Sequence, residues 1–152
     1  MRMAEKIFVV FFVMGFVLKL LHLEGAGLLI GLSITLLALL YFFLGLLLFN
    51  AISFRQVFKG NAFKGISAIR ILGSIGVGII LALSILGVMF SILHLEGAGF
   101  MLTFGLVSTL IVSLILIFKY LTQGSDSFYK NMIMRGGITF LVSLLTYLFL
   151  VF

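Results

Sequence analysis

Long apolar stretches alternate with short polar or glycine-rich ones along the whole chain. An α-helix needs roughly 17–25 predominantly apolar residues to cross the hydrocarbon core of a bilayer. Five stretches come close to that length, near 7–22, 27–49, 71–93, 100–118 and 136–152. The pattern predicts an all-α protein, a polytopic membrane bundle with about five transmembrane helices in a single membrane domain over 1–152.

The first and last stretches are the shortest, and each has an alternative interpretation. The first has the features of a cleaved signal peptide, with Arg2 and Lys6 as a charged region and 7–18 as an apolar core. However, it carries Lys19 and no A-x-A-like cleavage site follows, so we interpret it as a helix. The last stretch, 136–152, either spans the membrane with little tilt or ends inside it.

Lysine and arginine residues predict the orientation of the bundle, because loops rich in them stay in the cytoplasm. Nine of the ten basic residues fall on one side of the predicted bundle. They are Arg2, Lys6, Arg55, Lys59, Lys64, Arg70, Lys119, Lys130 and Arg135. The tenth, Lys19, lies within reach of the outer headgroups. We therefore expect the N-terminus in the cytoplasm and the C-terminus outside it.

A seven-residue motif occurs twice. Leu-His-Leu-Glu-Gly-Ala-Gly occupies 21–27 and returns unchanged at 93–99, and each copy joins two apolar stretches at a predicted outer tip. Because two helices separate the copies, both hairpins enter the membrane in the same direction, as in a parallel repeat. We therefore predict a first hairpin over 1–50, a second over 71–120 and a last helix over 136–152.

The repeated tip has a structural interpretation. Its glycines allow a tight reversal and a left-handed helix cap, and the alanine between them lets two helices approach closely. The glutamate begins the following helix, where a carboxylate favours the positive end of the helix dipole. The histidine ends the preceding helix and donates to its terminal carbonyls. These residues are His22, Glu24, Gly25, Ala26 and Gly27 in one copy and His94, Glu96, Gly97, Ala98 and Gly99 in the other.

The same tips also permit a functional interpretation, because a parallel repeat brings both motifs to one leaflet. Two histidines and two glutamates form a ligand set for a transition metal or an acid/base cluster, and two imidazoles can ligate a haem. His-x-Glu has no specific metal-ligand spacing, in contrast to His-Glu-x-x-His on one helix. We therefore expect no metal or other cofactor, and keep His22, Glu24, His94 and Glu96 as candidates for such a site.

Charge is scarce inside the predicted membrane region. No Asp, Glu, His, Lys or Arg lies near the middle of any apolar stretch, and the chain has no proline. Intramembrane ionisable groups and interrupted helices usually mark ion paths and transport sites. Two histidines and the distant Asp126 also form no catalytic set. The sequence thus disfavours a self-contained pump, a secondary transporter and an enzyme.

Composition narrows the class of protein further. The apolar share is 64% and the charged share 9%, whereas a soluble domain has about 45–50% and about 25%. So small a chain cannot bury that much apolar surface in water. The lack of cysteine and proline excludes disulfide-rich and collagen-like scaffolds. The net charge of +6 fits attraction to anionic lipids, and no basic stripe interleaved with aromatic residues indicates nucleic acid.

Small residues are spaced for close helix contacts in three of the apolar stretches. Residues of this kind, four apart, let backbones approach each other in lipid. They are Gly27, Gly31, Ser74, Gly78, Ala82, Gly105, Thr109 and Ser113. Such ridges fit packing inside the bundle and docking of partner helices alike.

The tips resemble the transmembrane hairpin of GldL, the inner-membrane motor subunit of gliding motility and type IX secretion. The residues that carry the resemblance are Lys19-Leu20-Leu21-His22 with Gly25-Ala26, and Ile92-Leu93-His94 with Gly97-Ala98, Met101-Leu102-Thr103 and Gly105-Leu106. It implies a bacterial inner-membrane protein whose hairpins assemble around other transmembrane helices. Lys19 and His22 match the family's Lys-x-x-His positions, and Ser91 replaces that lysine in the second copy. The carboxylate of the family's second helix has no counterpart in 28–49 or 100–118.

Two functions follow as expectations. The first is a non-catalytic integral subunit of a bacterial inner-membrane complex, with membrane lipids and other transmembrane proteins or copies of itself as partners. The alternative is an oligomeric channel, small transporter or motor-like ion conductor whose histidine and glutamate tips guard an outer entrance. Contact ridges, short loops and the lack of intramembrane chemistry favour the first.

Overall fold

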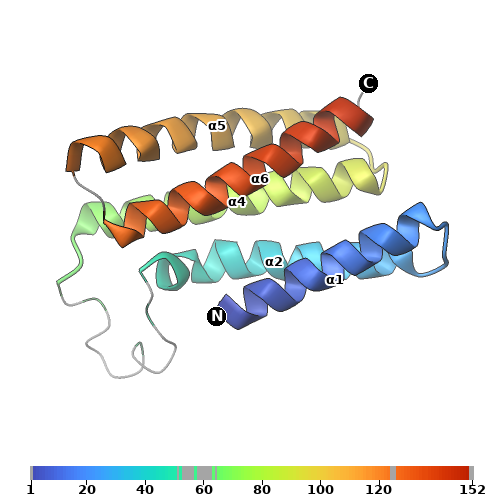
Figure 1. The fold of residues 1–152 in the computed structure, drawn as a ribbon, viewed down its shortest axis with the longest axis horizontal. Helices are drawn as coiled ribbons and strands as arrows, with labels where there is room; N and C mark the ends of the chain where they lie inside the picture. Colours follow the sequence, from blue (N-terminus) through green and yellow to red (C-terminus); the bar gives the residue numbers. More distant parts are fainter. Residues whose placement is uncertain are drawn as a thin grey trace.

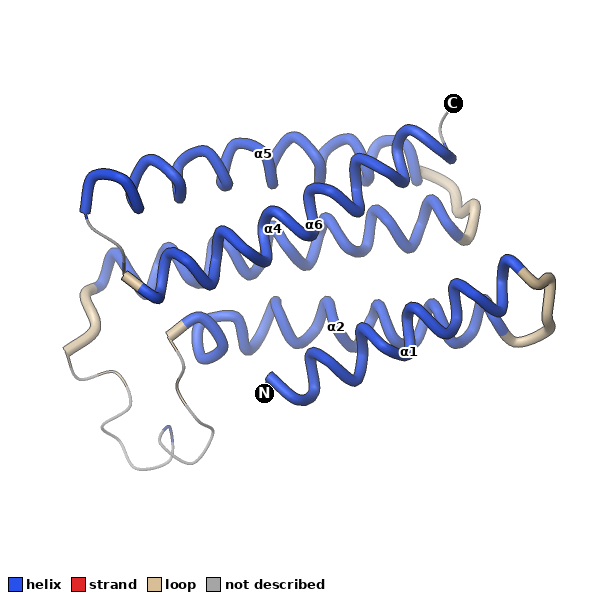
Figure 2. Tube along the Cα trace, in the orientation of Figure 1, coloured by secondary structure: helices blue, strands red, loops and turns tan. Residues whose placement is uncertain are grey.

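The computed structural model describes residues 2–50, 52, 57, 63, 65–123 and 126–150. Helix accounts for nearly all of this part of the chain, and it contains no strand (Figure 2). The five helices are α1 (Arg2–Leu20), α2 (Ala26–Phe49), α4 (Ala68–Ile92), α5 (Ala98–Gln123) and α6 (Ser127–Leu150). The predicted all-α class is confirmed. The predicted cytoplasmic residues Arg55, Lys59 and Lys64 lie outside the described residues.

Within the described residues, four helices are long and apolar enough to cross a membrane: α2, α4, α5 and α6. The first helix does not join them. Glu5, Lys6 and Lys19 all fall within its 19 residues, so its uncharged stretch covers only 7–18. At 1.5 Å per residue that stretch is about 18 Å long, well short of the roughly 30 Å hydrocarbon core.

The helices run alternately up and down the long axis of the molecule (Figure 1). The α1–α2 and α4–α5 connections, which hold the two copies of the repeated motif, lie at one end together with the end of α6 (Figure 1). The end of α2, the start of α4 and the α5–α6 boundary lie at the other, basic end (Figure 1). The two tips thus share one end of the bundle, as a parallel arrangement of hairpins requires.

Helix α4 is the centre of the bundle, because α2, α5 and α6 all pack against it while α1 packs on α2. Small residues set these contacts. A Cβ added to Gly78 would lie 2.5 Å from the Tyr41 carbonyl oxygen, and one added to Gly105 would lie 2.7 Å from the Ser84 Cα. Lipid offers no hydrophobic drive for helices to associate, so close backbone contacts of this kind stabilise the bundle.

The last helix begins at Ser127, nine residues before the predicted start at 136. Asp126 explains the difference, because its side-chain Oδ1 accepts from the Phe128 backbone N–H at 3.0 Å, as a helix N-cap does. Lys130 and Arg135 were expected in a loop and instead lie in the first three turns of α6. The longer helix therefore brings the charged side chain of Arg135 into the bundle interior.

Candidate functional site

A buried ionic cluster joins α1, α2 and α6. The Glu5 carboxylate accepts from Arg135 at both oxygens, from Nε to Oε1 at 2.7 Å and from Nη2 to Oε2 at 2.8 Å. The Tyr41 hydroxyl also donates to Oε1, at 2.6 Å. The Phe49 ring lies beside the guanidinium, with its centroid 6.0 Å from Arg135 Cζ. Three helices that are distant in the sequence thus meet at one carboxylate.

The cluster lies well inside the bundle. Arg135 comes eight residues after the start of α6 and Tyr41 eight residues before the end of α2, which places both about 12 Å from those helix ends. The exposed fraction of the side chain is 9% for Arg135 and 14% for Glu5. Charges in such a setting are retained only when paired and hydrogen-bonded.

The hydrogen bonds of Glu5 hold its carboxylate in a fixed position. A two-point contact between guanidinium and carboxylate is strong and fixes geometry, and an arginine keeps its charge in any protein environment. The carboxylate is therefore held ionised between two donors. The cluster fastens α1, whose main partner is α2, to the opposite helix α6.

The sequence prediction missed this cluster for a specific reason. The predicted helices began at 7 and 136, so they excluded Glu5 by two residues and Arg135 by one. Asp126 was the available signal, since an aspartate before a helical stretch is a strong N-cap and extends α6 to include Arg135. The pairing of two residues 130 positions apart has no local signal at all.

The two tips end their helices in the same backbone conformation. His22 and His94 have positive φ, 56° and 53°. In the first tip the His22 N–H donates to Lys19 O at 3.0 Å and the Leu23 N–H to Leu18 O at 3.0 Å. The equivalent bonds in the second tip are His94 to Ser91 at 3.2 Å and Leu95 to Phe90 at 2.9 Å. These paired bonds form a Schellman motif at each tip.

The predicted left-handed glycine is found in each tip, but the left-handed residue that ends the preceding helix is a histidine. Each histidine occupies that position, which glycine would fill with less strain. Gly25 and Gly97 also have positive φ, 82° and 77°, but they lead into the next helix, and Gly27 lies within helix α2. Residues that tolerate the left-handed region include histidine, although it does so less readily than glycine.

The four candidate ligands of the tips do not gather into a metal site. His22, Glu24, His94 and Glu96 are all exposed. Across the described part of the chain, no group of three or more His, Cys, Asp or Glu residues is placed to hold a metal ion. Glu24 directly precedes Gly25, the N-cap of α2, where the carboxylate lies near the positive end of the helix dipole.

A lysine links the two tips. Lys19 Nζ, in the last turn of α1, donates to the carbonyl oxygen of Ile92 in the last turn of α4. A cation at a helix C-terminus satisfies an orphan carbonyl and complements the dipole. The residue in the position of Lys19 in the second hairpin is Ser91, which is buried. The two hairpins are thus not equivalent in this contact.

The predicted contact ridges lie mostly inside the bundle. Ser74 and Gly78 face α2, where a Cβ on Gly45 would lie 3.1 Å from the Gly78 Cα, and Ala82 is buried on the same helix. Ser84 donates to the Gly105 carbonyl oxygen at 2.8 Å and contacts Thr109. Ser113 lies beside Gly136 on α6. Gly27 and Gly31 of α2 face Leu93, which belongs to the second tip. Internal contacts therefore occupy these ridges.

An apolar cavity of about 500 Å³ lies in the half of the bundle nearer the tips. It lies between α1 and α6, with Ile92 of α4 also in its lining. The apolar side chains that α1 and α6 contribute are Phe12, Phe16, Leu20, Val142, Leu145 and Phe149. Lys19, His94 and Thr146 add polar groups to the lining. The helices that Glu5 and Arg135 fasten together thus frame a large apolar space.

Comparison with known proteins yields no relative. No protein-family model, no curated protein and no solved structure matches the chain.

Proposed function

We propose that this protein is a non-catalytic integral subunit of a membrane complex, and that it holds a transmembrane helix of a partner in the cavity between α1 and α6. Four helices that are long and apolar enough to cross a membrane support its assignment as an integral membrane protein. The observation that carries the proposal is the cavity of about 500 Å³, which is lined mainly by apolar side chains.

The spacing of the lining residues favours a helix as the occupant. Phe12, Phe16 and Leu20 are four residues apart and form one stripe along α1. Val142, Leu145 and Phe149 follow at spacings of three and four along α6. The two stripes, one on α1 and one on α6, form the two sides of this cavity, which we call the groove. A third helix fits into such a groove with its own apolar face.

The rest of the surface leaves few other modes of assembly. Tight contacts between transmembrane helices use small residues, and the ridges centred on Gly78 and Gly105 are already occupied inside the bundle. The groove offers a partner bulky apolar side chains instead. The similarity of the tips to the GldL hairpin supports the same proposal, together with a bacterial inner-membrane location and a cytoplasmic N-terminus. The positions of the basic residues support that orientation.

A pair of substitutions on α6 tests the proposal. Leu145 lines the groove and Leu141 does not, yet their exposed fractions are similar, 52% and 57%. Leu145→Trp should fill the groove and release a partner that co-purifies with the wild-type chain in mild detergent. Leu141→Trp should retain it. Equal retention by the two variants would contradict docking in this groove.

The alternative is an oligomeric channel, small transporter or motor-like ion conductor. The Glu5–Arg135 pair favours it, because Arg135 lies about 12 Å from the start of α6 and ionisable groups inside a bundle are a common feature of ion paths. In that case Glu5→Gln abolishes ion flux in reconstituted vesicles while an assembly of identical chains persists. In the proposed subunit the same change weakens the bundle and alters no flux.

A further inference from the structure

Two adjoining hollows lie at the basic end of the bundle, away from the groove between α1 and α6. A polar hollow of about 280 Å³ is lined by Ser67, Ile69, Arg70, Lys119, Asp126 and Tyr129. A mainly apolar hollow of about 230 Å³ lies between α4, α5 and α6, and four of its lining residues are shared with the first. The two therefore form one amphipathic site with a charged mouth and an apolar chamber.

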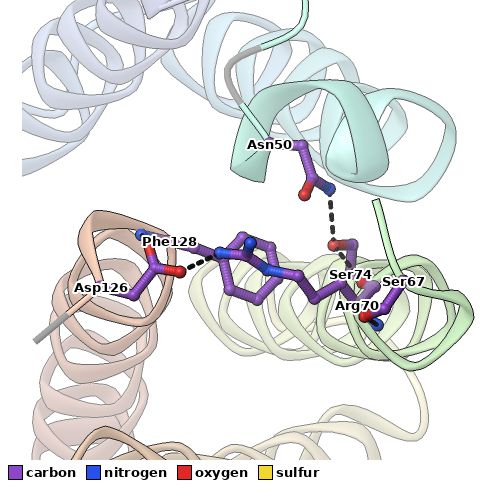
Figure 3. A network of polar contacts seen from close by, with 6 residues as sticks. All are labelled: Asn50, Ser67, Arg70, Ser74, Asp126 and Phe128. Carbon is purple, nitrogen blue, oxygen red and sulfur yellow. Dashed lines mark hydrogen bonds and ion pairs between the residues drawn. The ribbon is translucent and has the colours of Figure 1, made fainter. Parts of the chain in front are cut away.

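Arg70 is fixed at the mouth of this site. Its guanidinium lies over the Phe128 ring, with Cζ 4.4 Å from the ring centroid, and pairs with the Asp126 carboxylate (Figure 3). Ser74 donates to the Arg70 carbonyl oxygen at 2.7 Å and accepts from Asn50 Nδ2 at 2.9 Å, which ties the same turn of α4 to α2 (Figure 3). The arginine is thus held in place before any ligand arrives.

The charge at the mouth favours an anion. Arg70 and Lys119 supply two positive charges, and Asp126 offsets one of them. The Arg70 Nε is buried and has no hydrogen-bond partner, which is costly for a charged donor. A phosphate oxygen at the mouth accepts instead from the exposed part of the Arg70 side chain, which is 33% exposed, since guanidinium groups bind phosphate through several parallel donors.

The chamber owes its space to two glycines. A Cβ added to Gly73 or Gly76 would have no atom within 4 Å, so the wall of α4 is recessed there. Val112 and Leu116 of α5 and Met132 of α6 line the other sides. An apolar recess directly behind a cationic mouth suits a molecule with an anionic head and a hydrocarbon tail.

We infer that this site binds one anionic phospholipid, with the phosphate at Arg70 and Lys119 and part of an acyl chain along Gly73 and Gly76. Basic pockets between transmembrane helices at the cytoplasmic side are suited to anionic headgroups. The site lies at the end of the bundle that the charge distribution assigns to the cytoplasm. The inference does not depend on partner docking, because the groove between α1 and α6 uses other residues.

Native mass spectrometry of the purified, delipidated full chain tests the inference. The protein is offered equal amounts of phosphatidylglycerol and phosphatidylcholine with the same acyl chains. One phosphatidylglycerol should be retained with a preference of at least about fivefold, the factor expected for one net basic side chain. Lys119→Gln should remove that preference, whereas Lys130→Gln, an exposed lysine of the same end that lines neither hollow, should keep it. Equal retention of both lipids by the wild-type chain overturns the inference.

The chamber is tested by filling it. Gly76→Leu and Gly73→Leu place a side chain in open space and should fold normally while they reduce lipid retention about tenfold, the factor expected when one well-placed part of the acyl chain no longer binds. Gly137→Leu is the matched control, since its added side chain also meets open space but lies outside both hollows. Retention by both chamber variants at the wild-type level overturns the acyl-chain part. Release of the lipid by excess inorganic phosphate shows a site for free phosphate instead and overturns the lipid assignment.

Discussion

Glu5 and Arg135, 130 positions apart in the sequence, form a two-point ion pair inside the bundle. The pair fastens α1, the shortest of the five helices whose bounds are described, to α6, and these two helices frame the apolar groove. A buried pair of this kind adds little net stability relative to apolar side chains, but loss of one member leaves an uncompensated charge. The pair therefore fixes the position of α1.

The ion pair predicts strongly coupled effects of mutation. Glu5→Gln or Arg135→Gln should lower the free energy of unfolding in detergent by about 3–5 kcal/mol, the cost of breaking a buried pair. The double variant should lose less than the sum of the two, because neither charge remains unpaired. Glu24→Gln, at an exposed tip, should change stability very little. Additive losses in the double variant would show that the two residues act independently.

The contact between α2 and α4 predicts a size limit at Gly78. Gly78→Ala should destabilise the bundle by about 1–3 kcal/mol through overpacking, because the added Cβ would lie 2.5 Å from the Tyr41 carbonyl oxygen. Gly137→Ala should be neutral or slightly stabilising, since that Cβ meets open space within a helix. Thermal unfolding in the same detergent compares the two. If Gly78→Ala matches Gly137→Ala, α2 and α4 do not approach each other so closely.

The tip histidines predict an unusual result, namely that their removal stabilises the protein. His22→Gly should raise the free energy of unfolding by about 0.5–1 kcal/mol, because glycine adopts the left-handed conformation with less strain. His22→Val should lower it, since a branched side chain is poorly tolerated at positive φ. His94 should behave in the same way. A metal that co-purifies with the wild-type chain and is lost in both His22→Gly and His94→Gly would instead make the tips a functional site.

The basic residues predict the sidedness of the two ends. A reporter inserted at Gly25 should read as extracytoplasmic, and one fused after Lys59 should read as cytoplasmic, because lysine and arginine retain their loops on the inner side. Both readings in the opposite sense would reverse the topology and move the lipid site to the outer leaflet.

The sequence predicted the fold class well because membrane helices are defined by the length of their apolar stretches. The start of α6 was harder, since Tyr129, Lys130 and Asn131 give its first turns a polar composition and only the Asp126 cap marks the true boundary. Hydropathy alone therefore excluded Arg135 from the helix. Capping residues deserve equal weight with hydropathy when the ends of membrane helices are assigned.

The conformation of the tips and the position of the chamber could not be predicted from local sequence patterns. Glycine is the usual left-handed residue, so preference alone could not place His22 and His94 in that conformation. The recess at Gly73 and Gly76 exists because α5 and α6 leave space opposite them, whereas Gly78, two residues further on, is fully packed against α2. Spacing predicted a close helix contact at Gly78, and only the helix arrangement distinguishes that contact from the recess at Gly73 and Gly76.

The mass of the intact complex, purified in mild detergent without chemical crosslinking, tests the central claim most directly. The proposed subunit predicts a hetero-complex whose mass is not a whole multiple of 16.7 kDa, and predicts that Leu145→Trp dissociates it while Leu141→Trp does not. A ring of identical chains, unchanged by Leu145→Trp, would contradict the claim and favour the ion conductor.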